Sequence, residues 1–388
     1  MADILGEVSN YIIIAPSKYN KYVEECRQKG TKFIDPEFPP TSTSLSFPSH
    51  RNVVWKRIRE IIEDPVLVEG TIEPNDVQQG NIGDCYFLAV LAALAEKHSR
   101  IANIFENSLE TNEDGIYKLI VNDKGIPKEL VIDDYIPVYE HTNRPVFCKP
   151  HGKEIWVLLL EKAWAKMSGS YGNISAGYPH EVFNTFLIAP CFYYEISKGM
   201  DGLEQETIWN MLLEAEKYNW PTCAGSKANY VCQGIKTSHT YTLLGSYSVM
   251  GGGQMNRIVK LRNPWGGSEF LGKCSEHDRS FWDKIDSRQQ SQLGGERRND
   301  GTFTLSFDEF IRNFESVDIA HSRDNFNYNF ERILLKKATP TFFNITLSTD
   351  CELYLTIEKS FDRNLFIRDK VSSYGYNKLL IAEEMEDG

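Results

Sequence analysis

Three features are missing from this 388-residue sequence: a long apolar run, paired cysteines and a cluster of basic residues. No stretch approaches the ~20 apolar residues that span a bilayer, and no basic segment precedes the short apolar run "YIIIAP" near the N-terminus. The sequence therefore predicts neither a transmembrane segment nor a signal peptide. The eight cysteines are scattered without a CxxC pair, which indicates reduced thiols and a cytoplasmic protein.

The charge balance is acidic, with 42 Lys and Arg against 54 Asp and Glu and a net charge of -12. Such a surface repels polyanions on average, so nucleic acid and anionic lipid are excluded as expected partners. Hydrophobic residues make up 41% of the chain and aromatic residues 12%, enough for a packed core. The length predicts two or three domains.

The chain divides into four segments by composition and periodicity. Residues 1–49 are rich in Pro and Ser toward their end and are predicted to form an extended lead-in. Residues 50–198 contain a hairpin pattern over 115–138 and strongly apolar helical segments, so they predict a helical domain. The boundary is expected near "SKGMDG" (197–202).

The second half of the chain changes character. Residues 199–335 begin with a helix and continue as short β-rich runs separated by Gly clusters, which indicates an antiparallel sheet domain, with Ser306 capping a helical turn. Residues 336–388 alternate again, but are too few for the usual complete domain.

One cysteine stands where a Gly-punctuated loop becomes a buried helix, in "QQGNIGDCYFLAVLAALAE" (78–96). A free cysteine is more often a buried packing residue than a reactive one. At Cys85, however, the helix N-terminus favours the thiolate, and Gly80 and Gly83 permit close backbone approach. Gln79, six residues upstream, could donate a hydrogen bond to an oxyanion beside the sulfur.

A thiol nucleophile needs a base, and the base needs an orienting partner. His239, in "TSHTYTLLG", stands at the start of an apolar β run, although a histidine at this place can be purely structural. His321 is predicted to follow a helix and to have no special role. The other six histidines are in polar or loop contexts and are predicted to lie at the surface: His50, His98, His141, His151, His180 and His277.

Asn263 ends a second β run in "VKLRNPWGG", where an Asn before Pro is normally a turn residue. The order Cys, His, Asn is nevertheless that of papain-like enzymes. Trp265 could shield a His–Asn hydrogen bond from water, or plug the turn. A zinc site formed by Cys223, Cys232 and His239 is a further alternative, although its spacing is irregular and a fourth ligand is missing.

These motifs resemble those of the calpain family of cysteine proteases, in the correct order over about residues 32–335. Supporting matches include "WKRIREI", "IDDYIPV", "LLEKAWAKMSGSYG" and "DGTFTLSFDEF". The resemblance implies an α+β fold, a papain-like two-subdomain core with a helical Cys subdomain and an antiparallel β-sheet subdomain carrying His and Asn. It also implies that 336–388 begin a β-sandwich, either reduced or cut short.

The resemblance assigns Cys85 as nucleophile, His239 as general base and acid, Asn263 as its orienter and Gln79 as oxyanion donor. Tyr86 stands where the family has Trp, which should change packing at the helix start but not the chemistry.

Two regulatory calcium ions, one per subdomain, are also implied by the resemblance. In the first subdomain Asp76 matches a ligand position, but Gly172 stands where a Glu is usual, so this site is expected to be weak or lost. In the second subdomain, Glu269 and Asp300 match ligand positions, Glu276 stands where Asp is usual, and Thr302 replaces a Glu. Ordinary solvated loop acids are the alternative. No EF-hand loop is visible in the sequence.

The sequence therefore predicts an intracellular, calcium-dependent, calpain-like cysteine endopeptidase that cleaves protein substrates through an acyl-thioester, with an inhibitor or regulatory protein as a possible further partner. The alternative is a catalytically silent calpain-like interaction module. Retention of Cys85, His239 and Asn263 favours the enzyme.

Overall fold

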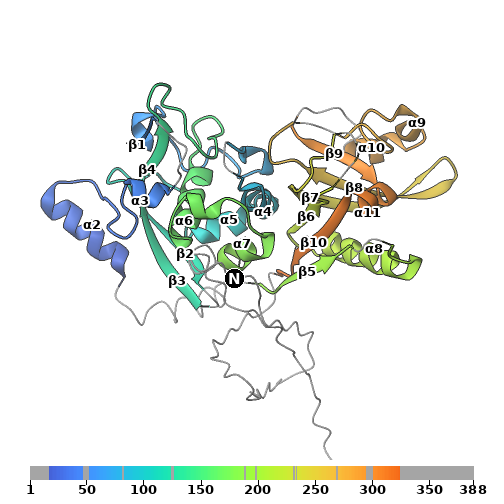
Figure 1. The fold of residues 1–388 in the computed structure, drawn as a ribbon, viewed down its shortest axis with the longest axis horizontal. Helices are drawn as coiled ribbons and strands as arrows, with labels where there is room; N and C mark the ends of the chain where they lie inside the picture. The colour runs from blue at the N-terminus through green and yellow to red at the C-terminus, as the bar shows by residue number, and fades with distance from the viewer. Residues whose placement is uncertain are drawn as a thin grey trace, which may run out of the picture.

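The chain forms an α+β structure with two lobes, seen side by side in Figure 1. The computed structural model describes residues 17–46, 52–80, 83–123, 126–187, 189–196, 199–229, 232, 234–267, 270–293 and 300–323. The predicted β-sandwich segment 336–388 lies outside these residues.

The first lobe is mainly helical and carries two small antiparallel sheets, β1-β4 and β2-β3. Its elements are α2 (Lys18–Lys29), α3 (Ser42–Leu45), β1 (Val53–Arg57), η1 (Ile58–Glu60), η2 (Pro74–Asp76), α4 (Cys85–Ala95), α5 (His98–Ile104), β2 (Ile116–Asp123), β3 (Ile126–Asp133), β4 (Tyr135–Tyr139), α6 (Trp156–Met167), η3 (Gly172–Ile174) and α7 (Pro179–Phe186). The predicted hairpin is present as β2 and β3.

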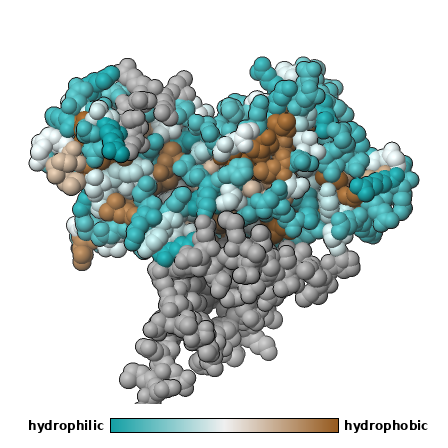
Figure 2. Space-filling view, turned by 180° about the vertical axis from the view of Figure 1, so that it is seen from behind, coloured by the Kyte–Doolittle hydropathy of each residue, from teal (hydrophilic) through white to brown (hydrophobic). Residues whose placement is uncertain are grey.

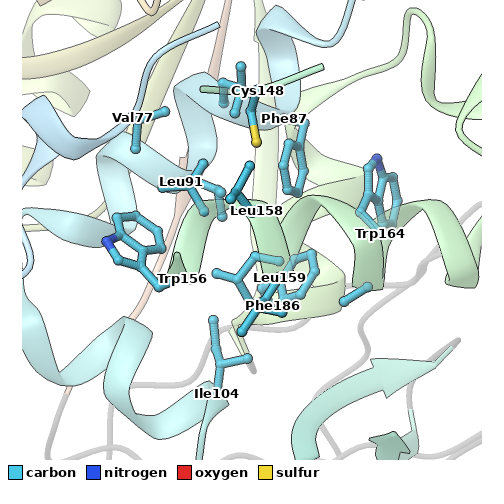
Figure 3. Close-up of a cluster of buried hydrophobic side chains, with 14 of the residues drawn as sticks. Val77, Phe87, Leu91, Ile104, Cys148, Trp156, Leu158, Leu159, Trp164 and Phe186 are labelled. Carbon is cyan, nitrogen blue, oxygen red and sulfur yellow. The ribbon is translucent and has the colours of Figure 1, made fainter. Parts of the chain in front are cut away.

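The core of this lobe forms around α4 and α6. Helix α4 is apolar on all sides, and a helix of that kind must be buried on all sides. Helix α6 is also buried along most of its length, although it carries Glu161 and Lys162. Every residue of α4 after Cys85 is buried. Figure 3 shows Leu91 of α4 among Trp156, Leu158 and Leu159 of α6, so the helix that begins at Cys85 is fixed along its whole length.

The second lobe contains a six-stranded antiparallel sheet in the order β5-β10-β6-β7-β8-β9. Its elements are β5 (Cys191–Glu195), α8 (Gly202–Lys217), β6 (Thr222–Ser226), β7 (Thr240–Gly251), β8 (Gln254–Arg262), α9 (Arg279–Trp282), α10 (Ser287–Leu293), β9 (Thr302–Ser306), α11 (Phe307–Asn313) and β10 (Phe314–Ala320). Ser306 caps α11 as predicted, accepting a hydrogen bond from the Glu309 N–H.

One predicted boundary and the predicted conformation of the lead-in differ from the structure. The sequence put residues 191–195 in the first subdomain, but they form β5 and pair with β10, so the second lobe starts before residue 197. Local periodicity could not reveal a partner strand so far along the chain. The lead-in is also not merely extended: α2 buries Cys26 in a small cluster with Phe33, Ile116 and Val131, because it has its own apolar face.

The lobes meet where α4 packs against β7. Thr242 of β7 donates a hydrogen bond from Oγ1 to the Ala89 carbonyl of α4 at 2.8 Å. Arg262, at the end of β8, donates to the Val77 carbonyl at 3.0 Å and to Asn75 Oδ1 at 3.2 Å. These contacts hold the two lobes in a defined position relative to each other beside Cys85.

The face that lies behind the view of Figure 1 is mostly hydrophilic, with separate hydrophobic patches (Figure 2). Within the described ranges, no helix has the length and apolar character needed to cross a membrane.

Candidate active site

A cleft of about 360 Å³ lies between the lobes. Cys85 and Gln79 line it from the first lobe, and His239 and Trp265 line it from the second. The structure thus brings together four of the predicted site residues from distant parts of the chain. Asn263, which is fully buried, lies behind His239.

The loop before Cys85 has a backbone path that depends on Gly80. A Cβ at Gly80 would lie 1.4 Å from the Phe147 carbonyl oxygen, so no larger residue fits without a shift of the backbone. The Gly83 carbonyl accepts a hydrogen bond from the Ala176 N–H at 2.8 Å. Between them these contacts set where the loop ends and the helix starts.

Gln79 joins this loop to the second lobe. Its backbone N–H donates to the Pro264 carbonyl at 3.1 Å, in the turn after Asn263. Its side-chain Nε2 donates to Asp84 Oδ1 at 3.4 Å. The amide is therefore held beside Cys85 by contacts to both lobes.

Tyr86, the residue after Cys85, forms hydrogen bonds through its hydroxyl group. Its hydroxyl donates to the Ile174 carbonyl at 3.1 Å and accepts from Trp164 Nε1 at 2.9 Å. The ring is buried, so the tyrosine fits within the helix packing.

Burial raises the pKa of the Cys85 thiol above its usual value. Hydrogen bonds from Thr240 and Tyr86 act in the opposite direction but do not outweigh burial. Burial therefore outweighs the effect of the helix N-terminus, which was expected to favour the thiolate. The thiol is neutral and needs a base.

Two carboxyl groups are buried next to Cys85, on Asp84 and Glu161. Burial raises the pKa of Glu161 to about 7, and burial together with Glu161 raises the pKa of Asp84 well above its usual value. Glu161 Oε1 also accepts a hydrogen bond from the Cys148 N–H at 2.9 Å. This pair was not predicted from the sequence. The signal for it was Glu161 itself, a charged residue within the largely apolar run "WVLLLEKAW", which indicates a buried carboxyl group.

The imidazole of His239 is oriented by an amide. Its Nε2 lies 2.9 Å from Asn263 Oδ1, which leaves Nδ1 as the other ring nitrogen for proton transfer. Asn263 is itself fixed, because its Nδ2 donates to the Gly267 carbonyl at 2.8 Å and its backbone N–H donates to the Gly301 carbonyl.

Burial lowers the pKa of His239 to about 4, against the opposing effect of the hydrogen bond to Asn263. The imidazole is therefore neutral at neutral pH and has a free lone pair to accept a proton. Thr240, the next residue, contacts the Cys85 thiol. A neutral thiol and a neutral imidazole on opposite walls of one cleft can act as nucleophile and general base.

The Trp265 ring lies against the His239 ring in a tilted arrangement, with a centroid distance of 4.8 Å and an interplanar angle of 57°. The backbone N–H of Trp265 donates to Asn263 Oδ1 at 3.1 Å. The indole is half exposed, so it covers the histidine from the solvent side, and Lys236 Nζ lies 5.5 Å from its ring centre.

The zinc alternative is wrong. The one group of three metal-ligating side chains that the described residues bring together consists of Asp76, His151 and Glu154. Cys223 is fully buried within β6, and His239 is hydrogen-bonded to Asn263.

Several histidines also differ from the prediction. His180 is half-buried and lies 3.1 Å from Asp318, and half-buried His98 accepts a hydrogen bond from the Ile72 N–H. His321 follows strand β10 instead of a helix and is buried, stacked on Trp220. His141 and His277 are exposed as predicted, whereas His50 lies outside the described residues.

The residues predicted as calcium ligands are only partly assembled. In the first lobe Asp76 is buried beside His151 and Glu154. A side chain at Gly172 would meet the Ser46 carbonyl, since a Cβ there would lie 2.2 Å from it. Asp76 thus lies against a histidine nitrogen, whereas calcium prefers oxygen ligands.

In the second lobe Glu276 is buried and Asp300 is half-buried, accepting a hydrogen bond from the Thr302 N–H at 2.9 Å. Glu269 lies outside the described residues. Asp300 is next to Gly301, whose carbonyl accepts the Asn263 N–H.

Comparisons with known proteins agree with this arrangement. A family described as "Calpain family cysteine protease" matches residues 33–321. Calpain-2 catalytic subunits of Rattus norvegicus and Homo sapiens are each 30% identical over 332 residues, covering 82% of this chain and 47% of the relative. Calpain clp-4 of Caenorhabditis elegans is 28% identical, covering 82% of this chain and 45% of its own length. The chain thus spans about half the length of these relatives.

Proposed function

Because the chain belongs to the calpain family of cysteine proteases, we propose that it is an endopeptidase that cleaves protein substrates with Cys85, His239 and Asn263. The observation that carries this proposal is the 2.9 Å contact of His239 Nε2 with Asn263 Oδ1, on the wall of the cleft that Cys85 also lines. An orienter, a base and a nucleophile are the three parts that thiol catalysis needs.

In the proposed reaction His239 takes the proton of the Cys85 thiol, and the sulfur attacks the carbonyl carbon of the scissile peptide bond. The resulting oxyanion is stabilised by the Gln79 amide and the Cys85 N–H. The protonated His239 then gives its proton to the leaving amine, and an acyl-thioester forms. Water, activated by the neutral His239, hydrolyses the thioester and regenerates the thiol.

We propose that the protein acts inside the cell, in a reducing compartment. The support is that the seven cysteines in the described ranges are free thiols. A reduced state is needed for Cys85 to react.

We propose that calcium regulates the activity through the second lobe. Support comes from Glu276 and Asp300, which are oxygen donors, and from the neighbouring Gly301–Asn263 hydrogen bond. Peptidase activity titrated with calcium, with a chelator control, tests this part: flat activity would contradict calcium regulation and leave the protease intact.

The protease itself is tested with the purified chain and an unstructured protein substrate. We expect cleavage by the wild type and none by Cys85→Ala; equal behaviour of the two would contradict the proposal. The competing function is a catalytically silent interaction module. A thiol-reactive epoxide should label Cys85 at neutral pH, and His239→Ala should protect it, whereas a silent module would show no dependence on His239.

A further inference from the structure

A second cluster of chemically active side chains lies outside the cleft, on Asp76, His151 and Glu154. One ligand atom from each lies within 4.8 Å of the others. His151 Nδ1 is 3.3 Å from Asp76 Oδ1 and 3.7 Å from Glu154 Oε2. Ligands about 2.1 Å from a tetrahedral ion are about 3.4 Å apart, so these distances suit one shared ion.

Both carboxylates are pre-oriented. Asp76 Oδ2 accepts the Glu73 N–H at 2.8 Å, in the capping box of η2, and Glu154 Oε1 accepts the Glu69 N–H at 2.7 Å. In each carboxylate one oxygen is thus fixed by the backbone, and the other faces His151. Hydrogen bonds of this kind hold ligand groups in place around protein-bound metals.

The two carboxyl groups of the cluster are almost completely shielded from solvent. The side chains of Asp76 and Glu154 are only 6% and 4% exposed. Two carboxylates side by side with so little solvent repel each other unless they share a proton or a cation lies between them. The His151 side chain is 54% exposed, so an ion could enter from solvent and keep water as a further ligand.

We infer that Asp76, His151 and Glu154 form a binding site for a divalent transition metal of the zinc class. An imidazole nitrogen with two carboxylate oxygens is a donor set that Zn²⁺ accepts. Calcium prefers six to eight oxygen ligands, so this set does not suit it. The ligand set differs from the calcium site expected from Asp76 and position 172, and it does not rest on the proposed proteolysis.

The site lies where three segments of the first lobe meet, at Val66, at Asp76 and at residues 149–154. The residue Glu154 pairs with Val66 in an isolated bridge, and Gln78 pairs with Lys149. Asp76 is three residues before Gln79. A bound ion would therefore fasten the loop that carries the oxyanion donor to the 149–154 segment, and should raise the thermal unfolding temperature of the protein.

The test is a titration of the metal-stripped full chain with Co²⁺ and then Zn²⁺, followed by visible absorption and calorimetry. The Cys85→Ala background removes the reactive thiol as a competing ligand. We expect one saturable ion per chain, without a thiolate charge-transfer band. His151→Ala should weaken binding at least about tenfold, and Glu154→Gln should weaken it too. His141→Ala, a substitution at another exposed histidine, is the matched control and should bind normally.

Three outcomes would overturn the inference. His151→Ala could bind as tightly as the control, which would put the metal elsewhere. Saturable binding could be missing, which would make the cluster a polar contact of His151 with the two carboxyl groups and not a metal site. Calcium at equal concentration could displace Co²⁺, which would make it an oxygen-only site.

Discussion

Replacing Glu161 with glutamine should make the stability of the protein less dependent on pH. Glu161 and Asp84 are both buried and interact with each other, and burial raises the pKa of each, that of Glu161 to about 7. Glutamine has nearly the same shape. Its carbonyl can accept the hydrogen bond that the Cys148 N–H now donates to Glu161, and its amide can donate to an oxygen of the Asp84 carboxyl group.

The size of the effect follows from the pKa of Glu161. In the unfolded chain this carboxyl ionises near its usual 4.5, and in the folded protein near 7. Between these values the folded state binds more protons than the unfolded state, so the free energy of unfolding falls as pH rises. At about 1.4 kcal/mol per pKa unit, the wild type loses about 3 kcal/mol across this window. Glu161→Gln should not lose it.

The assay is urea unfolding at about pH 5, 6, 7 and 8, followed by tryptophan fluorescence. Both proteins should carry Cys85→Ala, so that self-cleavage does not interfere. The difference in free energy of unfolding between Glu161→Gln and the parent should grow in favour of the variant by about 3 kcal/mol from about pH 5 to about pH 8. Glu110→Gln, at an exposed carboxylate, is the control and should give no such trend.

Parallel pH profiles for Glu161→Gln and its parent would refute the reasoning. They would mean that Glu161 ionises alike in the folded and unfolded states. If the parallel profile of the variant also lay lower at every pH, Glu161 would in addition be needed for packing.

Three further predictions concern the cleft and the lobe interface. Gly80→Ala should lower both the unfolding temperature and the turnover number, because its Cβ would lie 1.4 Å from the Phe147 carbonyl oxygen. Gly83→Ala is the control, because its Cβ would meet Ser175 Oγ at 3.4 Å, an ordinary contact. Equal losses of unfolding temperature in the two variants would contradict the argument. Asn263→Ala should reduce kcat/KM about 10- to 100-fold. It should also lower the pKa of His239 further, since the hydrogen bond that is lost raises this pKa. Steady-state kinetics and an NMR titration of His239 measure the two effects, and an unchanged pKa would contradict the prediction. Thr242→Val should cost about 1 kcal/mol in urea unfolding, because its hydroxyl donates to the Ala89 carbonyl; an unchanged midpoint would mean that this bond does not hold the lobes.

Features set by neighbouring residues were predictable from the sequence. The apolar run after Cys85 became α4, the alternation over 115–138 became β2 and β3, and Ser306 became a helix cap. Helix and strand periodicity and capping chemistry act over a few residues, so a single sequence carries them.

The electrostatic state of the site was not predictable in the same way. The helix N-terminus at Cys85 suggested a thiolate, but burial reverses that effect and raises the pKa of the thiol. Burial depends on what packs over a group from elsewhere in the chain, here the start of β7 at Thr240. Sequence spacing does not give that information.

The sequence by itself determined which chemistry was available: a thiol at a loop-to-helix junction, with a histidine and an asparagine at β runs in the second half. Only the tertiary structure decided which side chains meet. It placed Cys85 and His239 on the walls of one cleft, Asp84 against Glu161, and Asp76 against His151 and Glu154. The physical reason is that contact and desolvation arise from packing between segments distant along the chain, whereas residue type and local periodicity are written in the chain itself.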